Sequence, residues 1–205
     1  MTSLTLVRHG ETDWNLVGRI QGATDIPLND TGRRQAREAA ADLGERLHGP
    51  VAIVASDLSR ARETAEIIAG ELGLPVPRLY PGLRERGYGA AEGITGDEFA
   101  ARFGPWATAQ VPGAETADRL RRRAVAAVRR VAHDVRRATA PAAASVIVVS
   151  HGALIRELVR HVTHGDLPEP GTSLPNGGGY TLLFERERLR LVDAARSGAA
   201  QAERV

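Results

Sequence analysis

Short apolar runs alternate with amphipathic segments along the chain, and this alternation predicts strands followed by helices. The apolar runs have the length of buried strands, and the last of them predicts a hairpin: residues 3–8, 51–56, 76–80, 145–150 and 179–193. The other segments repeat apolar residues every three or four positions, which predicts helices over residues 31–47, 60–72, 115–138 and 151–162, with a shorter one near 95–103. The sequence contains no internal repeat.

Strands that alternate with amphipathic helices predict a three-layer α/β/α fold, with a largely parallel central sheet covered on both faces. With 205 residues, the chain is long enough for one sizeable core. We expect a single domain over residues 1–193 and a flexible tail over 194–205. Residues 94–115 lie in a segment rich in Gly and Pro, and we expect them to form a lid.

The composition excludes several kinds of chemistry. The chain has no cysteine and no lysine, so all 27 basic residues are arginine. Disulfides, thiolate metal sites, cysteine nucleophiles, Schiff-base lysines and a lysine-bearing phosphate loop are therefore excluded. The nucleophile of any covalent catalysis must be His, Ser, Thr, Asp, Glu or Tyr.

Charge and hydropathy argue against nucleic-acid and membrane partners. The pI is about 9.6, but 25 acidic residues nearly balance the arginines and leave a formal net charge of +2. No apolar run reaches the roughly 18–20 residues of a membrane helix, and the first residues do not read as a signal peptide. We expect a cytoplasmic protein, and the sequence leaves its oligomeric state, including a homodimer, open.

Two histidines, His9 and His151, each directly follow a predicted buried strand and each precede a glycine. A lone histidine in such a place most often satisfies a loop. Two of them fall on one edge of the predicted sheet, where ligands of such folds bind, and this indicates a site. Gly10 and Gly152 permit tight turns and close approach of the backbone to a ligand. His151 also lies where a helix begins, and free N–H groups there favour a bound anion.

Four sequence motifs, which include both histidines, carry a resemblance to a known protein family. They are LVRHGETDWN at 6–15, SDLSRARETA at 56–65, LRERGYGAAEG at 83–93 and VVSHG at 148–152. In order and spacing they resemble the phosphoglycerate-mutase-like branch of the histidine phosphatase superfamily, over nearly the whole chain. The resemblance implies a phosphohistidine enzyme that acts on a small phosphorylated metabolite and uses no metal or cofactor.

The resemblance also implies a role for each matching residue. His9 attacks phosphorus and becomes a phosphohistidine. Glu85 gives a proton to the leaving group and later acts as the base for water. Arg8, Arg60 and His151 complete the catalytic set. The residues implied to line or border the phosphate pocket are Arg8, Asn15, Gln21, Gly22, Arg60, His151 and Gly152.

Elementary chemistry favours the same residue types. Phosphate monoesters hydrolyse extremely slowly without a catalyst, so positive donors must surround the oxygens of the transferred group as charge shifts. Arginine suits this task because it stays charged and binds oxygens bidentately. A neutral imidazole is a competent nucleophile near pH 7 and a cationic one is not, so His9 must be held neutral with one nitrogen pinned by a hydrogen bond.

Other polar residues admit both a functional and a structural reading. Glu92 competes with Glu85 as the acid, but the motif position makes Glu92 structural. Glu11 reads as a loop residue near the site. His161 and His164 have the spacing to share a metal, but without a suitably spaced carboxylate they read as the end of a solvated helix.

The arginine clusters at 119–123 and 129–137 invite a nucleic-acid reading. A solvated face of an amphipathic helix is the preferred account of both. For Trp14 and Trp106, packing is at least as good an explanation as contact with a substrate.

Three functions fit the sequence. We prefer a phosphatase; the alternatives are a 2,3-bisphosphoglycerate-dependent phosphoglycerate mutase and a non-catalytic domain that binds phosphorylated ligands. The complete catalytic pattern disfavours the last. Only 66 positions separate Glu85 from His151, whereas the mutases that this chain resembles carry a longer insert with basic residues there. The substrate stays open among sugar phosphates, phosphoglycerate-type esters, phosphoserine and cofactor precursors, and Phe99, Phe103 and Trp106 suggest an apolar wall in the lid.

Overall fold

A single sheet organises the chain. The computed structural model describes residues 1–47, 49–169 and 171–195. Within these residues, six strands pair in the order β3-β2-β4-β1-β5-β6. Their bounds are β1 (Thr2–Arg8), β2 (Val51–Ala55), β3 (Arg78–Leu79), β4 (Ala144–Ser150), β5 (Gly179–Glu185) and β6 (Arg188–Ala195). The pairs among β1 to β4 are parallel, while β5 and β6 add an antiparallel hairpin beside β1. The predicted α/β class with a largely parallel sheet is confirmed.

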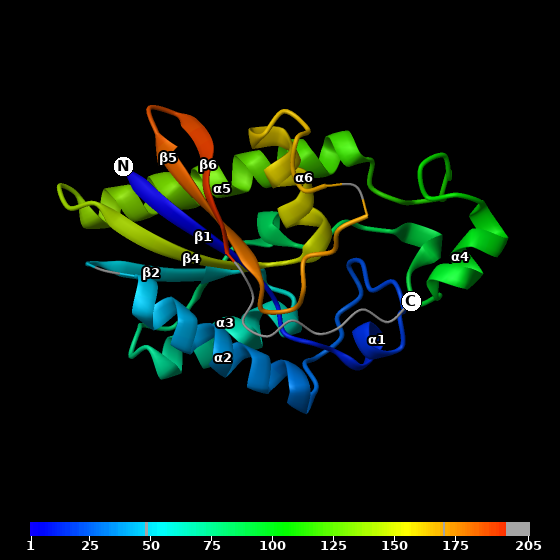
Figure 1. Cartoon of the computed structure of the whole chain (residues 1–205), viewed down its shortest axis with the longest axis horizontal. Helices are drawn as coiled ribbons and strands as arrows, with labels where there is room; N and C mark the ends of the chain where they lie inside the picture. The colour runs from blue at the N-terminus through cyan, green and yellow to red at the C-terminus, as the bar shows by residue number, and fades with distance from the viewer. Residues whose placement is uncertain (48, 170, 196–205) are drawn as a thin grey trace.

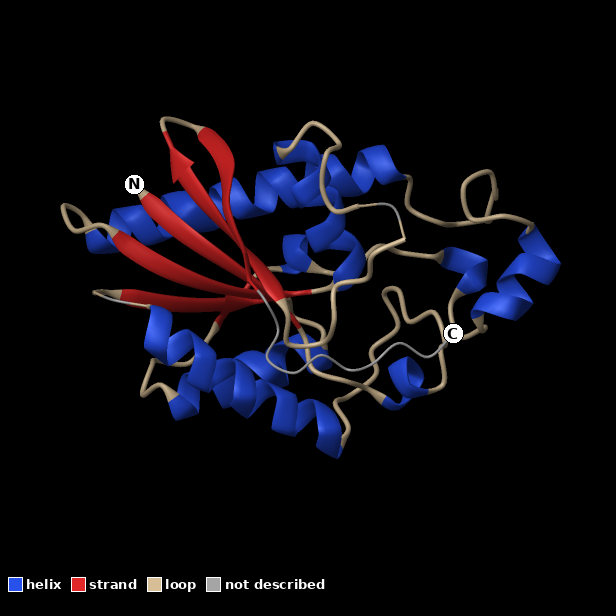
Figure 2. Cartoon of the chain, in the orientation of Figure 1, coloured by secondary structure: helices blue, strands red, loops and turns tan. Residues whose placement is uncertain are grey.

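Helices cover both faces of this sheet. The α-helices of the described residues are α1 (Asp13–Leu16), α2 (Asp30–Arg46), α3 (Ser59–Glu71), α4 (Gly96–Phe103), α5 (Ala117–Thr139) and α6 (Gly152–Val162). Figure 1 shows α2 and α3 on one side of the sheet and α5 and α6 on the other. In Figure 2, α4 lies beyond the end of the sheet, within the segment predicted to be a lid. None of the helices in the described part of the chain is both long and apolar enough to cross a membrane.

The central strand β4 shows why the sheet is buried on both faces. Its side chains alternate in direction, so Val146 and Val148 pack in the core under α5 and α6. Ile147 and Val149 point the other way and pack against α2 and α3. A strand of this kind reads as a continuous apolar run, which explains why 145–150 could be predicted from hydropathy alone.

Two predicted elements differ from the structure. The strand expected over 76–80 is reduced to Arg78–Leu79, because Pro75 and Pro77 have no N–H to give to a ladder. At the other end, β6 continues to Ala195, so the predicted tail begins too early. The rest of that prediction, residues 196–205, lies outside the described residues.

Candidate active site

The carboxyl ends of β1 and β4 bring the two histidines together. Arg8 and Ser150 are partners in the parallel register, and the His9 N–H donates to the Ser150 carbonyl at 2.9 Å. The centroids of the His9 and His151 rings lie 5.1 Å apart, and both side chains are buried. Adjacent parallel strands therefore produce the juxtaposition that the two His-Gly pairs suggested.

The tautomer of His9 follows from one hydrogen bond. Its Nδ1 lies 2.6 Å from the Gly10 carbonyl oxygen, and a carbonyl only accepts, so Nδ1 carries the proton. Burial, with the positive charges of Arg8 and Arg60, lowers the pKa of His9 well below 6.5, while the bond to Gly10 opposes the shift. His9 is therefore neutral at pH 7, and Nε2 keeps the lone pair that a nucleophile needs.

Close backbone packing fixes the loop that carries His9. A Cβ on Gly10 would overlap the carbonyl oxygen of Gly32 on α2, so this position needs glycine. The Gly10 N–H donates to the Thr64 hydroxyl at 3.1 Å. Asn176 Nδ2, in the loop before β5, donates to the His9 carbonyl at 2.8 Å. The loop that carries His9 is thus held from α2, α3 and the loop before β5.

Arg60 reaches this site from the first turn of α3, and its side chain is buried. Its two terminal nitrogens donate to the carbonyls of Thr24 and Gly22, both at 2.8 Å. Gly22 has φ +57°, and a Cβ there would overlap the Glu92 carboxylate. Glycine at 22 therefore lets the 21–24 loop pass between Arg60 and Glu92.

Arg8 is the last residue of β1 and directly precedes His9, at the same edge of the sheet. One of its terminal nitrogens donates to the Leu174 carbonyl, and its Nε would lie 3.5 Å from a Cβ placed on Gly152. Burial lowers the pKa of both Arg8 and Arg60, and the nearby charge of Glu85 acts in the opposite direction on each. Arginine nevertheless stays cationic in proteins.

Several buried polar atoms around the histidines have no hydrogen-bond partner within the described part of the chain. They are Arg8 Nε, Arg60 Nε, Gln21 Oε1 and both ring nitrogens of His151. Burial, followed by the charge of Arg60, lowers the pKa of His151 well below 6.5. Buried polar groups are normally paired, so unpaired groups that gather at one place indicate a site for a polar ligand. With two guanidinium groups present, that ligand is an anion.

Comparison with known proteins agrees with this geometry. Residues 4–196 match the histidine phosphatase superfamily (branch 1). The chain belongs to this superfamily. The uncharacterized phosphatase PhoE of Bacillus subtilis (strain 168) is 38% identical over 193 residues, which are 94% of each chain. A metal-independent phosphoserine phosphatase of Arabidopsis thaliana is 36% identical over 174 residues, 80% of this chain and 69% of that protein.

Solved structures and further relatives lead to the same superfamily. Mycobacterial glucosyl-3-phosphoglycerate phosphatase, determined with VO3, superposes with a TM-score of 0.77 at 32% identity and covers 96% of this chain and 99% of its own. A probable phosphoglycerate mutase GpmB of Photorhabdus laumondii subsp. laumondii is 35% identical over 167 residues, 78% of this chain and 74% of that protein. The relatives therefore include proteins named as phosphatases and proteins named as probable phosphoglycerate mutases, the two enzyme functions that the sequence analysis considers.

In this histidine phosphatase, Glu85 lies against the helix that follows His151. Its Oε2 accepts from the Ala153 N–H at 3.0 Å and its Oε1 from the Leu154 N–H at 3.1 Å. The Arg86 N–H adds a third bond at 2.8 Å. His151 is the N-cap residue of α6 but caps with no side-chain bond, so Glu85 satisfies N–H groups that the helix leaves open.

Glu92 has a structural place in the same region. Its two oxygens accept from the Ala23, Thr24 and Tyr88 N–H groups and from the Thr24 hydroxyl, at 2.6–3.0 Å. Burial raises the pKa of Glu92, but these hydrogen bonds outweigh burial and lower it overall. A carboxylate held this way ties the 21–24 loop to residue 88, and because both of its oxygens already accept hydrogen bonds, neither is free to carry a proton for a leaving group.

The remaining predicted residues take defined places. Asn15 Oδ1 accepts from the Thr12 N–H and hydroxyl in a capping box at the start of α1, so its contact with phosphate stays a prediction. Glu11 accepts from the side chain of Asn29, the residue that caps α2. Within the described residues, no three His, Asp or Glu side chains are placed to hold a metal ion.

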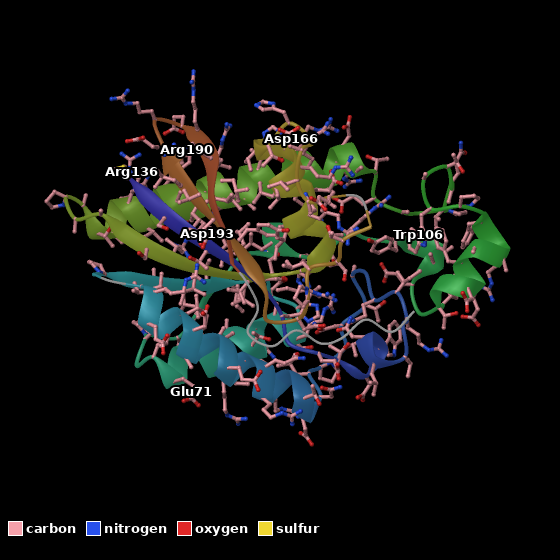
Figure 3. All side chains as sticks on the ribbon, in the orientation of Figure 1. Glu71, Trp106, Arg136, Asp166, Arg190 and Asp193 are labelled. Carbon is pink, nitrogen blue, oxygen red and sulfur yellow. The ribbon has the colours of Figure 1, made fainter. Side chains whose placement is uncertain are left out.

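The aromatic residues of the predicted lid pack on one another. Phe99 is buried, its ring stacks on that of Trp106 with centroids 3.7 Å apart, and Phe103 lies 5.4 Å away. Trp106 sits beside α4, away from the sheet (Figure 3). Packing therefore accounts for Phe99 and for one face of Trp106, whose side chain is still 52% exposed. An apolar wall that contacts substrate stays a prediction.

Sequence reasoning missed some residues that shape the site. Asp25 accepts from the Ser59 N–H and hydroxyl, both at 2.7 Å, at the start of the helix that carries Arg60. Thr64 stands inside the SDLSRARETA motif, which was a usable signal. Asn176 lies in a Pro-Asn-Gly run typical of a turn, but its bond to His9 spans 167 positions and no local pattern reveals it.

The lowered pKa values of His9 and His151 make stability depend on pH. Both are neutral in the folded protein, whereas in the unfolded chain they take up protons near pH 6.5. The free energy of unfolding is therefore highest above about pH 6.5 and falls below it, by up to about 1.4 kcal/mol per histidine per pH unit.

We expect the thermal midpoint of the protein to drop between pH 7 and 5.5, and to drop less in the double variant His9→Gln/His151→Gln. Exposed His164→Gln is the control; an equal drop in all three proteins contradicts the assignment.

Proposed function

We propose that the chain hydrolyses small phosphate monoesters through a phosphohistidine on His9. One observation carries the proposal: a buried neutral imidazole, with its Nδ1 proton held by Gly10, stands at a site flanked by Arg8, Arg60 and His151. An imidazole flanked by two arginines in this way is arranged for attack on an electrophile bearing negative charge.

The reaction has two steps. His9 Nε2 attacks phosphorus while the bond from phosphorus to the ester oxygen breaks, and Glu85 gives that oxygen its proton. Water then attacks the phosphohistidine, Glu85 takes a proton from the water, and phosphate leaves with His9 restored. Arg8 and Arg60 balance the charge on the transferred group, and this is the task that a metal ion has in other phosphoryl-transfer enzymes.

The mutase remains the second candidate, because probable phosphoglycerate mutases are among the relatives. A mutase must keep water from its phosphoenzyme until the phosphoryl group returns to a substrate. Between Glu85 and His151, the predicted lid places the eight-residue helix α4 beyond the end of the sheet, and the rest of the segment forms α5 and β4. The resemblance implies that the mutases carry a longer basic insert in this segment. A cytoplasmic location and a homodimer stay predictions.

Release of free phosphate should therefore exceed isomerisation. We expect a panel of alkyl phosphates, including phosphoserine and 3-phosphoglycerate, to contain substrates that yield inorganic phosphate faster than 3-phosphoglycerate is converted to 2-phosphoglycerate. The assay contains EDTA, because no metal is needed. His9→Ala is the matched control for contaminating phosphatase. Faster isomerisation than phosphate release from every member of the panel, or activity that only added Mg²⁺ or Zn²⁺ restores, contradicts the proposal.

A further inference from the structure

Arg123 on α5 departs from the solvated arginine face that the sequence predicts for residues 119–123. Its Nη1 donates to the carbonyls of Gly82 and Arg84 at 3.0 and 2.7 Å, and its Nη2 donates to the carbonyl of Glu85 at 3.1 Å. The neighbouring Arg122 is 74% exposed, whereas Arg123 is 26% exposed. For Arg123 the sequence-based reading was wrong, because a helical repeat identifies a polar face but not what packs on it.

Glu115 completes the contacts of Arg123. The Glu115 carboxylate, whose side chain is 12% exposed, accepts from Arg123 Nε at 3.0 Å and from Nη2 at 2.7 Å. Burial raises the pKa of Glu115, but the hydrogen bonds and charge of Arg123 outweigh burial and lower it. The ion pair is therefore intact at neutral pH.

The guanidinium group of Arg123 makes five hydrogen bonds in all, which equals its number of N–H groups. Three of these bonds hold the backbone that leads to Glu85. Lysine has three N–H groups on one nitrogen and cannot reproduce the planar arrangement. The contacts are thus specific for arginine, which distinguishes them from a surface ion pair.

Glu115 also joins the end of the predicted lid to the same loop. Its N–H donates to the Gly87 carbonyl at 2.7 Å, and its carbonyl accepts from Arg86 Nε at 2.8 Å. The backbone around Glu85 is therefore held on both sides, from α5 by Arg123 and from the lid by Glu115. The Glu85 carboxylate itself is held at the start of α6.

We propose that Arg123 and Glu115 are positioning residues that place the Glu85 carboxyl group for proton transfer to the leaving oxygen. The proposal rests on the proposed function, in which Glu85 is the acid. A carboxyl group displaced by about 1 Å can lose roughly 10²-fold in rate. Because neither residue acts on the phosphoryl group, loss of the pair should slow the proton transfer to the leaving oxygen and leave the rate of attack by His9 nearly unchanged.

The test compares alkyl and aryl phosphates. An alkoxide needs a proton in order to leave, whereas a nitrophenolate leaves with little help. In Arg123→Met we expect kcat with an alkyl phosphate to fall about 10–100-fold, and the single-turnover burst of nitrophenolate to change little. Arg122→Met, one position along α5, should match the parent protein with both substrates. Equal losses with both substrates in Arg123→Met overturn the proposal.

Two further variants keep the test decisive. Arg123→Met/Glu115→Gln removes both charges, so a loss that persists does not come from an unpaired buried carboxylate. In Arg123→Met/Glu85→Gln the loss with alkyl phosphates should be no greater than in Glu85→Gln alone, because both changes act on one proton transfer. Losses that multiply overturn the proposal. Failure of the proposed function is a separate result, since the parent protein then gives no burst and no phosphate.

Discussion

Replacing His9 with alanine should lower turnover by roughly 10⁴–10⁶-fold, the effect of removing a covalent nucleophile. The imidazole donates one hydrogen bond, from Nδ1 to the Gly10 carbonyl, which leaves Nε2 as the only ring atom with a lone pair that can attack phosphorus. Steady-state kinetics with the best alkyl phosphate of the panel measures the loss. His161→Ala on the exposed side of α6 is the control and should keep full activity.

The fold should survive this change. Alanine removes one buried hydrogen bond, worth about 1 kcal/mol. The loop keeps the bond that the Gly10 N–H donates to Thr64 and the bond that it accepts from Asn176. Circular dichroism and the thermal midpoint separate loss of chemistry from loss of structure. A folded His9→Ala protein that retains more than a few per cent of activity would show that another residue is the nucleophile.

Glu85→Gln should produce the second largest effect, and only with poor leaving groups. Glutamine keeps the shape of the side chain and removes the titratable proton, so alkyl phosphates should lose the roughly 10²–10⁴-fold that general acid catalysis supplies. Formation of the phosphoenzyme from a nitrophenyl phosphate should be much less affected. Single-turnover burst kinetics are required, because in the proposed mechanism Glu85 also activates water in the second step.

Glu92→Gln is the matched comparison. Its carboxylate accepts bonds from Ala23, Thr24 and Tyr88, so the amide should destabilise the 21–24 loop, at a cost of about 1–3 kcal/mol, and should slow alkyl and aryl phosphates alike. A leaving-group dependence in Glu92→Gln and not in Glu85→Gln would reverse the assignment. If neither variant shows it, Glu11 or Asp13 becomes the next candidate for the proton donor.

Local patterns predicted the elements that carry the site. The apolar runs of β1 and β4 identify strands buried on both faces, and parallel pairing then forces residues that follow these strands onto one edge. The adjacency of His9 and His151 could be inferred for this reason. The shortening of β3 by Pro75 and Pro77 was also readable, since both prolines stand in the sequence.

Contacts between distant segments could not be predicted in this way. Arg123 has the same helical environment in sequence as the exposed Arg122, and only the tertiary fold brings the 82–85 backbone to it. The bonds from Ser59, at the start of α3, to Asp25 and the bond from Asn176 to His9 are of the same kind. Such bonds form between groups that become neighbours only when the sheet is assembled, and the periodicity of apolar and polar residues along the sequence does not indicate them.

The phosphohistidine is tested most directly by trapping it. Enzyme mixed with a ³²P-labelled alkyl phosphate and denatured within the first turnover should retain label that is stable in base and released in acid, and peptide mapping should place it on His9. The His9→Ala protein should retain none. Label that is stable in acid, label on a residue other than His9, or rapid turnover without any labelled protein would contradict the mechanism.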